Sequence, residues 1–178
     1  MDELGIKKRM MFIMEEDYNF LAYNTFIILN GLGCNRKKGK LKDHRKISFL
    51  IDFVANGKLV DILEKSNRND SINSVDLEIL NRSYTNALLR IKTINQLIYT
   101  LTNEDLIYVE NRKLDRLSVS LVKDNIDLEF FKGDLFKIER GNIKRLKEEV
   151  KRITILDISN LLEKLYYKHG IIDEQLFS

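Results

Sequence analysis

The change in the spacing of apolar residues between residues 75 and 122 constrains the fold most strongly. From about residue 75 to residue 103 the apolar side chains recur with a period near 3.6, which predicts a long amphipathic helix. The helix has a possible break near Lys92, with Thr93 as a new N-cap. Residues 106–110 are strand-like, and residues 117–122 alternate between apolar and polar, which predicts a second strand. We therefore expect a helix followed by a β-hairpin, with its loop at residues 111–116.

The rest of the chain is predicted to be helical. Apolar stripes indicate helices in the first 65 residues over 16–33, 41–56 and 58–65, with a basic loop at 34–40 and a polar loop at 66–74. In the last third we expect a helix from residue 127 that is interrupted at Gly141-Asn142, and a final helix over 155–167 capped by Thr154. The predicted fold class is mainly α with a small β-hairpin. This is a winged-helix-like core over residues 1–124 with C-terminal helices over residues 125–178 packed on it.

Composition supports this expectation. The chain has 178 residues and no proline, which suits uninterrupted helices in one domain with a core of its own. Cys34 is the single cysteine, so no internal disulfide is possible and we expect an intracellular protein. The apolar run at residues 10–14 is too short for a signal-peptide core or a membrane span. We therefore expect a cytoplasmic protein that does not enter a membrane.

Positive charge is concentrated in one short run, residues 36–46. This run holds seven Lys or Arg and one Asp, a net charge of +6, whereas the whole chain carries +3, so the rest of the chain sums to −3. In one interpretation the run presents cations to phosphates or to an acidic partner. In the other it is a solvated charged loop. The candidate phosphate-binding or partner-binding residues are Arg36, Lys37, Lys38, Lys40, Lys42, Arg45 and Lys46.

A second basic segment spans residues 137–152, with seven Lys or Arg against three Glu. It is either a second phosphate-facing surface or, as we favour, an ordinary charged helix with pairs such as Lys144–Glu148. Aromatic residues do not alternate with the first basic run, so duplex backbone or an acidic protein is a better ligand than single-stranded nucleic acid. The final apolar helix at 155–167 either docks on a partner or, as we favour, closes the core.

The residues that catalysis needs are scarce. No nucleotide-binding glycine loop, zinc-ligand spacing or nucleophile elbow is present, so we expect no enzyme activity and no cofactor. Neighbouring cations would lower the pKa of the Cys34 thiol, but we favour a cysteine that simply packs. We interpret Asp43 and His44 as an ion-paired, solvated helix start, and His169 as a helix C-terminal residue near exposed carbonyls.

The order of segments resembles a known family. The segments Asp17–Asn19 and Ala22–Leu29 are followed by Leu41–Phe53, by Arg82–Tyr84 and by the helix and hairpin of residues 90–122. Over residues 17–122 the chain is similar to the middle component of bacterial three-component ABC systems. These systems resemble Lamassu anti-phage defence systems and their small C subunit.

The resemblance implies a non-catalytic accessory subunit in a hetero-oligomer with an SMC-like ABC ATPase and an effector nuclease. The subunit would bridge the ATPase to double-stranded DNA, to the effector, or to both. An alternative is a free-standing winged-helix transcriptional regulator, which predicts a homodimer on a paired operator. A third hypothesis is an adaptor that binds only protein. The sequence alone leaves these three open.

Overall fold

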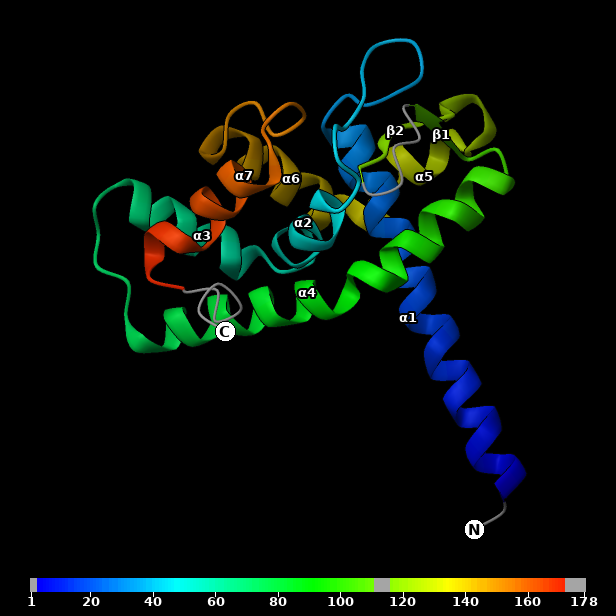
Figure 1. Ribbon diagram of the computed structural model, residues 1–178, viewed down its shortest axis with the longest axis horizontal. Helices are drawn as coiled ribbons and strands as arrows, with labels where there is room; N and C mark the ends of the chain where they lie inside the picture. The colour runs from blue at the N-terminus through cyan, green and yellow to red at the C-terminus, as the bar shows by residue number, and fades with distance from the viewer. Residues whose placement is uncertain (1–2, 111–115, 172–178) are drawn as a thin grey trace.

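The fold is mainly helical with one small β-hairpin, as the sequence predicts (Figure 1). The computed structural model describes residues 3–110 and 116–171, with side chains from residue 17 onward. Within this part of the chain there are seven α-helices and two strands. None of these helices is long and apolar enough to cross a membrane. Most of the expected hairpin loop, residues 111–115, lies outside the described residues.

Helix α2 (Lys46–Ala55) forms the centre of the molecule because three other helices cover it. It packs against α1 (Glu3–Gly31), α4 (Ser74–Asn103) and α6 (Lys137–Glu149). As a result Ile47, Phe49, Leu50, Ile51, Phe53 and Val54 are all buried. At Asn56 the chain turns directly into α3 (Gly57–Asn67), where the Asn56 side chain accepts a hydrogen bond from the backbone N–H of Lys58 at 3.1 Å.

Helix α4 is continuous along one edge of the molecule (Figure 1). Asn73 caps its start, with the side-chain oxygen 2.8 Å from the backbone nitrogen of Asp76. The possible break near Lys92 does not occur. Buried residues continue on both sides of it, from Ala87 to Ile94 and Leu97, because one face of the helix lies on the core throughout its length.

The hairpin forms as predicted, from β1 (Ile107–Glu110) and β2 (Ser118–Leu121). The strands are antiparallel, with Ile107 opposite Leu121 and Glu110 opposite Ser118. The segment before α2 flanks the other edge of β2, since Leu41 exchanges two backbone hydrogen bonds with Val119. The prediction that a helix begins at residue 41 is therefore wrong. Leu41 pairs with Val119 of β2 instead, and His44 N–H donates to the Leu117 carbonyl just before that strand.

The C-terminal third is helical but is divided differently from the prediction. A short helix α5 (Leu128–Lys132) ends at Gly133, whereas α6 runs through Gly141 without interruption. The last helix, α7 (Ile158–Leu165), is capped by Asp157 rather than by Thr154. Three short 3-10 turns complete this region, at Lys123–Asn125, Asp134–Phe136 and Tyr167–His169.

One hydrophobic core joins the residues before and after position 125. Tyr166 is fully buried and packs against the rings of Phe49, Phe53 and Tyr84, at centroid distances of 6.3, 5.6 and 5.1 Å. Its hydroxyl lies 3.0 Å from that of Ser83, so this buried polar group has a hydrogen-bond partner. The apolar face of α7 belongs to the same core. The described part of the chain is thus built around a single interior.

Candidate phosphate-binding surface

The basic loop, residues 36–42, is attached to β2 by backbone hydrogen bonds. Arg36 N–H donates to the Leu121 carbonyl at 3.0 Å, and Leu41 N–H donates to the Val119 carbonyl at 2.8 Å. Between these two attachments a turn closes where Lys38 and Gly39 both donate to the Asn35 carbonyl. The cations of the loop therefore extend from a fixed backbone. Those whose residues are exposed are Arg36, Lys37, Lys38 and Lys42.

Two other predicted cations are neutralised by neighbouring carboxylates. Lys40 pairs with Glu110 at the end of β1. Arg45 pairs with Asp43, with 2.6 Å between Nη2 and Oδ2. Burial alone would raise the pKa of Asp43, but the hydrogen bonds and charge of Arg45 outweigh it and hold the pKa below its ordinary value. Lys40 and Arg45 are thus less available to an external anion than the four exposed cations.

Lys46 is buried, and the prediction that it faces phosphate is wrong. Its side chain is 0 % exposed. The Nζ atom donates to the carbonyls of Ile153, Thr154 and Leu156, at 2.7, 3.2 and 2.9 Å. Burial disfavours the charged amine and lowers the pKa of Lys46 to about 8. Lys46 is therefore an internal bridge between the start of α2 and the turn that follows α6.

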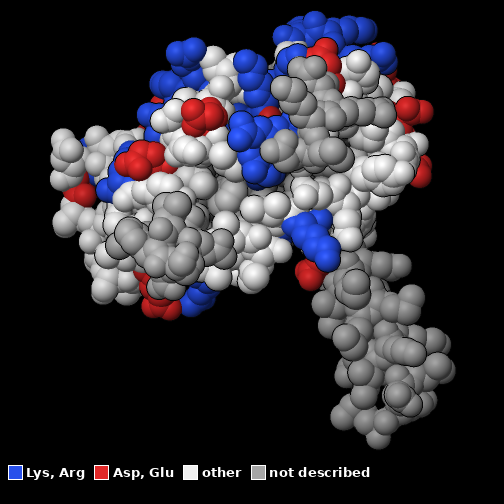
Figure 2. Space-filling model, in the orientation of Figure 1, with Lys and Arg blue, Asp and Glu red and all other residues white. Residues whose placement is uncertain are grey.

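This bridge places a second group of cations beside the basic loop. The basic turn, residues 150–156, lies between α6 and α7, and its Thr154 carbonyl also accepts a hydrogen bond from Lys42 N–H at 2.9 Å. Lys151 and Arg152 of this turn are exposed. Figure 2 shows Lys and Arg side chains along the upper edge of the molecule, above both segments. We call this surface the basic face; it consists of Arg36, Lys37, Lys38, Lys42, Lys151 and Arg152.

The remaining cations of the second basic segment are partly used inside the fold. Arg145 bonds to Asp61 and Glu64 of α3, and Lys147 Nζ donates to the Gly31 carbonyl at the end of α1. These contacts fix α6 against its neighbours. The interpretation as an ordinary charged helix thus applies to α6. Lys151 and Arg152 lie beyond its end and belong to the basic face.

His44 is buried, and its interpretation as a solvated residue is wrong. Its Nδ1 atom accepts a hydrogen bond from Leu117 N–H at 3.2 Å, and its Nε2 atom lies 2.6 Å from Oδ1 of Asn95. These partners fix the neutral ring with its proton on Nε2. Burial lowers the pKa of His44, although the Asn95 hydrogen bond opposes this effect. His44 therefore joins the residue before β2 to α4.

Cys34 and His169 are structural residues as well. Cys34 is 1 % exposed, and burial raises the pKa of its thiol to about 11 despite the charges of Lys46 and Lys147. A reactive thiolate is thus disfavoured, and the packing interpretation holds. His169 lies within hydrogen-bond distance of the Lys164 carbonyl and of the Ser66 hydroxyl, at 3.3 and 3.0 Å.

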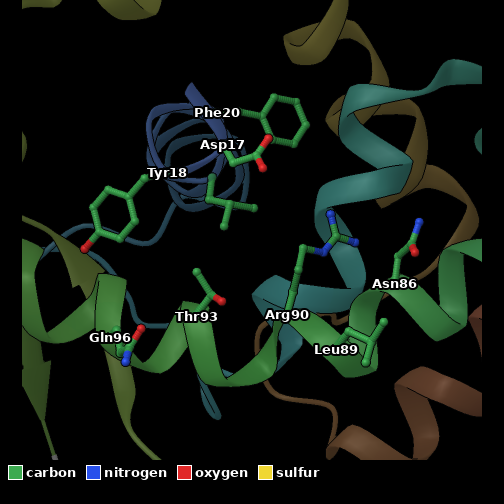
Figure 3. Close-up of a pocket in the computed structure, with 9 residues that line it drawn as sticks. Asp17, Tyr18, Phe20, Asn86, Leu89, Arg90, Thr93 and Gln96 are labelled. Carbon is green, nitrogen blue, oxygen red and sulfur yellow. The ribbon is translucent and has the colours of Figure 1, made fainter. Parts of the chain in front are cut away.

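A concave region lies between α1 and α4, away from the basic face. It has a volume of about 600 Å³, and Figure 3 shows Phe20 and Asp17 on the α1 side and Leu89 and Thr93 on the α4 side. The Arg90 side chain extends toward α2, where Nη2 is 2.7 Å from Oδ1 of Asp52. The charge of Arg90 is therefore compensated internally.

Neither a metal site nor a relative defines the function further. Among the described residues no group of three His, Cys, Asp or Glu side chains is arranged to hold a metal ion. Comparison with protein-family models, curated proteins and solved structures finds no match to this chain. The basic face is the feature on which a functional proposal rests. The charge of the sequence predicts the basic loop as a binding site. It does not single out Lys151 and Arg152, because in the sequence they are part of the charged segment of residues 137–152.

Proposed function

We propose that this chain is a non-catalytic accessory subunit that binds the phosphate backbone of double-stranded DNA through its basic face. The observation that carries the proposal is the meeting of two basic segments that are about a hundred residues apart in sequence. Lys42 N–H and the buried amine of Lys46 hold the basic turn against the basic loop. Six exposed cations on one face suit a polyanion with regularly spaced charges.

Lys and Arg side chains that contact phosphates increase the affinity for DNA but do not distinguish its base sequence. Lys and Arg bound to phosphates release condensed counterions, which contributes free energy independent of base sequence. The basic loop also has a fixed backbone, so little order has to be imposed on it when a ligand binds. The order of a long helix, α4, and a two-stranded hairpin, β1 and β2, supports the winged-helix-like interpretation of the fold.

The resemblance to the middle component of three-component ABC systems supports a proposal about partners. In this proposal the subunit works in the cytoplasm in a defence complex with an SMC-like ABC ATPase and an effector nuclease, and bridges the ATPase to DNA. Co-expression with an ATPase of this class from the neighbouring genes tests it. The proposal expects the two chains to co-purify, and a chain that stays alone at micromolar concentration would count against it.

DNA binding is tested by the salt dependence of duplex affinity. The variant changes the six residues of the basic face to glutamine, and the control changes the exposed Arg68 and Lys92, which lie elsewhere, to glutamine. Each phosphate contact contributes about −0.9 to the slope of log K against log salt concentration. We expect the slope to flatten by about 5 in the variant, at about 0.9 for each of the six residues, and to remain unchanged in the control. An unchanged slope in the variant would refute DNA binding by this face.

The hairpin that follows α4 also favours the alternative of a free-standing regulator. Such regulators usually bind paired half-sites as dimers. Light scattering of the purified chain with and without duplex gives its oligomeric state. Together with its affinity for duplexes of different sequence, this distinguishes the two proposals. A dimer that selects one sequence over random duplex supports the regulator, whereas a monomer with equal affinity for all sequences supports the accessory subunit.

A further inference from the structure

One end of the basic face contains a recess, which we call the basic pocket. It lies between residues 35–38 of the basic loop and residues 121–124 after β2, and its volume is about 580 Å³. Cations approach it from both sides, with Arg36, Lys37 and Lys38 on one wall and Lys123 on the other. Asp124 is the acidic residue among its lining residues. The pocket therefore has four cations for one carboxylate.

The walls of the basic pocket are held by backbone hydrogen bonds. Leu121 accepts from Arg36 N–H and donates to the Cys34 carbonyl, at 3.0 and 2.9 Å, which ties the two walls together at their base. Val122 N–H donates to the Leu106 carbonyl at 3.0 Å, which holds the second wall to the start of the hairpin. The recess thus exists before any ligand arrives, as is usual for small-ligand sites.

Two of the four cations are positioned by aromatic rings. The Arg36 guanidinium carbon lies 4.7 Å from the centroid of the Tyr108 ring, and Lys123 Nζ lies 5.5 Å from that of Phe131. These contacts are cation–π interactions. A guanidinium stacked on a ring keeps its N–H edge available for two parallel hydrogen bonds to an oxyanion.

The carboxylate of Asp124 competes only weakly with an incoming anion. It lies 3.5 Å from Lys37 Nζ, and both side chains are 83 % exposed. Exposed pairs of this kind contribute little because water screens the two charges. An anion in the pocket is therefore attracted by the charge of Lys37, and loss of the Lys37–Asp124 pair costs little free energy.

We propose that the basic pocket binds a phosphomonoester dianion, with Arg36 as the bidentate ligand and Tyr108 as its positioning residue. This inference rests on the proposed function only in that both use the basic face. A phosphodiester in a DNA backbone carries one negative charge, whereas a phosphomonoester carries nearly two at neutral pH. Four cations around one concave site favour the more highly charged group. A free nucleotide and the end of a polynucleotide chain both supply it.

The direct test is titration of the full-length chain with adenosine monophosphate, adenosine and sulfate by calorimetry. We expect adenosine monophosphate to bind and adenosine not to bind. The second pKa of a phosphomonoester is about 6, so its affinity should fall between pH 7.5 and pH 5, whereas sulfate, a dianion at both pH values, should show no matching fall. Equal binding of adenosine and adenosine monophosphate would overturn the proposal.

Three variants distinguish phosphomonoester binding in the basic pocket from duplex binding by the rest of the basic face. Arg36→Lys keeps the charge but loses the planar fork, and Tyr108→Leu removes the ring; each should weaken adenosine monophosphate binding about tenfold. A combined change of Lys42, Lys151 and Arg152 to glutamine should leave that binding unchanged but flatten the salt slope on duplex DNA. If Arg36→Lys and Tyr108→Leu leave nucleotide binding unchanged, the pocket proposal fails even where duplex binding persists.

The source of the group is found by comparing a 5′-phosphorylated duplex with the same duplex without the phosphate. A preference for the phosphorylated duplex that Arg36→Lys abolishes identifies a chain end as the ligand. Equal affinity for the two duplexes, together with nucleotide binding, identifies a free phosphomonoester. If neither the nucleotide nor the phosphorylated end binds, the proposal is wrong.

Discussion

The basic run divides into two regions at Lys42. Residues 36–42 lie along β2 with most of their cations in solvent, whereas Asp43, His44, Arg45 and Lys46 are buried or partly buried. The two regions are consecutive, and both carry Lys and Arg. The difference shows that charge density in a sequence does not distinguish cations that meet a ligand from cations that hold the fold. What distinguishes them here is burial with internal partners, since Lys46 donates to three carbonyls more than a hundred positions away and Arg45 pairs with the neighbouring Asp43.

The buried region also determines the shape of the exposed one. Lys46 joins three carbonyls of the basic turn, and that turn carries Lys151 and Arg152. The exposed cations make few internal contacts and should contribute little to stability, so they remain free to bind. The effect of a substitution on stability should therefore decrease from the buried side chains to the exposed ones.

The largest effect is expected for Lys46→Met. The substitution removes three charge-assisted hydrogen bonds and leaves the Ile153 and Leu156 carbonyls without this donor. We expect the free energy of unfolding to fall by about 3 kcal/mol, because a buried unpaired acceptor costs more than an unmade surface contact. Urea denaturation at pH 7 measures it. Lys42→Met is the matched control and should change stability by no more than about 0.5 kcal/mol; equal losses in the two variants would contradict the division.

The next largest effect concerns His44, which should make stability depend on acid pH. Its pKa is lowered from 6.5 in the folded protein, so the unfolded chain binds a proton at higher pH than the folded chain does. The stability that the neutral ring contributes is therefore present above pH 6.5 and is lost as the pH falls through the folded-state pKa.

The variant His44→Leu separates this effect from those of other groups. We expect it to lower stability at pH 7.5 by about 2 kcal/mol, because Leu117 N–H loses its acceptor. It should also reduce the loss of stability between pH 7 and pH 5. Urea midpoints at pH 7.5, 6.0 and 5.0 test both statements. Parallel pH profiles for the two proteins would show that His44 does not carry the dependence.

Arg145 is the intermediate case, with a side chain that is 36 % exposed. Its guanidinium bonds to both Asp61 and Glu64, and these bonds raise the pKa of Arg145 and lower that of Glu64. Because the pair is partly solvated, we expect Arg145→Met to cost about 1 kcal/mol, and less at high salt. Thermal and urea unfolding at 0.05 and 0.5 M NaCl measure it. A loss of stability as large as that of Lys46→Met would contradict the expectation that the effect of removing a cation grows with its burial.

The smallest effect on stability is expected for Asp124→Asn, which removes the exposed pair with Lys37. We expect a change below about 0.5 kcal/mol in the free energy of unfolding. The same variant should strengthen binding of adenosine monophosphate about twofold, because the carboxylate no longer opposes the anion. Weaker nucleotide binding in this variant would mean that Asp124 organises the pocket rather than opposing its ligand.

The sequence predicted the elements whose signals are local. The stripe from Leu77 to Leu101 defined α4, and the alternation from Leu117 to Val122 defined β2. The exposed loop cations were found from charge alone. Residues 41–45 were misassigned because their partner, Val119, is almost eighty positions away. The buried state of Lys46 depends on carbonyls more than a hundred positions away, and no local pattern encodes it.

The same physical reason explains the error at the start of α7. Thr154 had the residue type of an N-cap, but its carbonyl accepts from Lys42 and Lys46, and Asp157 caps the helix instead. The interruption at Gly133 rather than Gly141 is supported by a tertiary contact, since Arg140 Nη2 donates to the Gly133 carbonyl at 2.6 Å. Glycine alone did not indicate which of the two positions ends a helix.

If the basic loop and the basic turn form one phosphate-binding face, both must contribute to the salt dependence of duplex binding. The measurement is duplex affinity against salt concentration for three proteins: Lys38→Gln with Lys42→Gln, Lys151→Gln with Arg152→Gln, and all four changes together. We predict that each pair flattens the slope by about 2 and that the four changes flatten it by about 4. A slope that responds to only one pair, or to neither, would contradict a single face made of both segments.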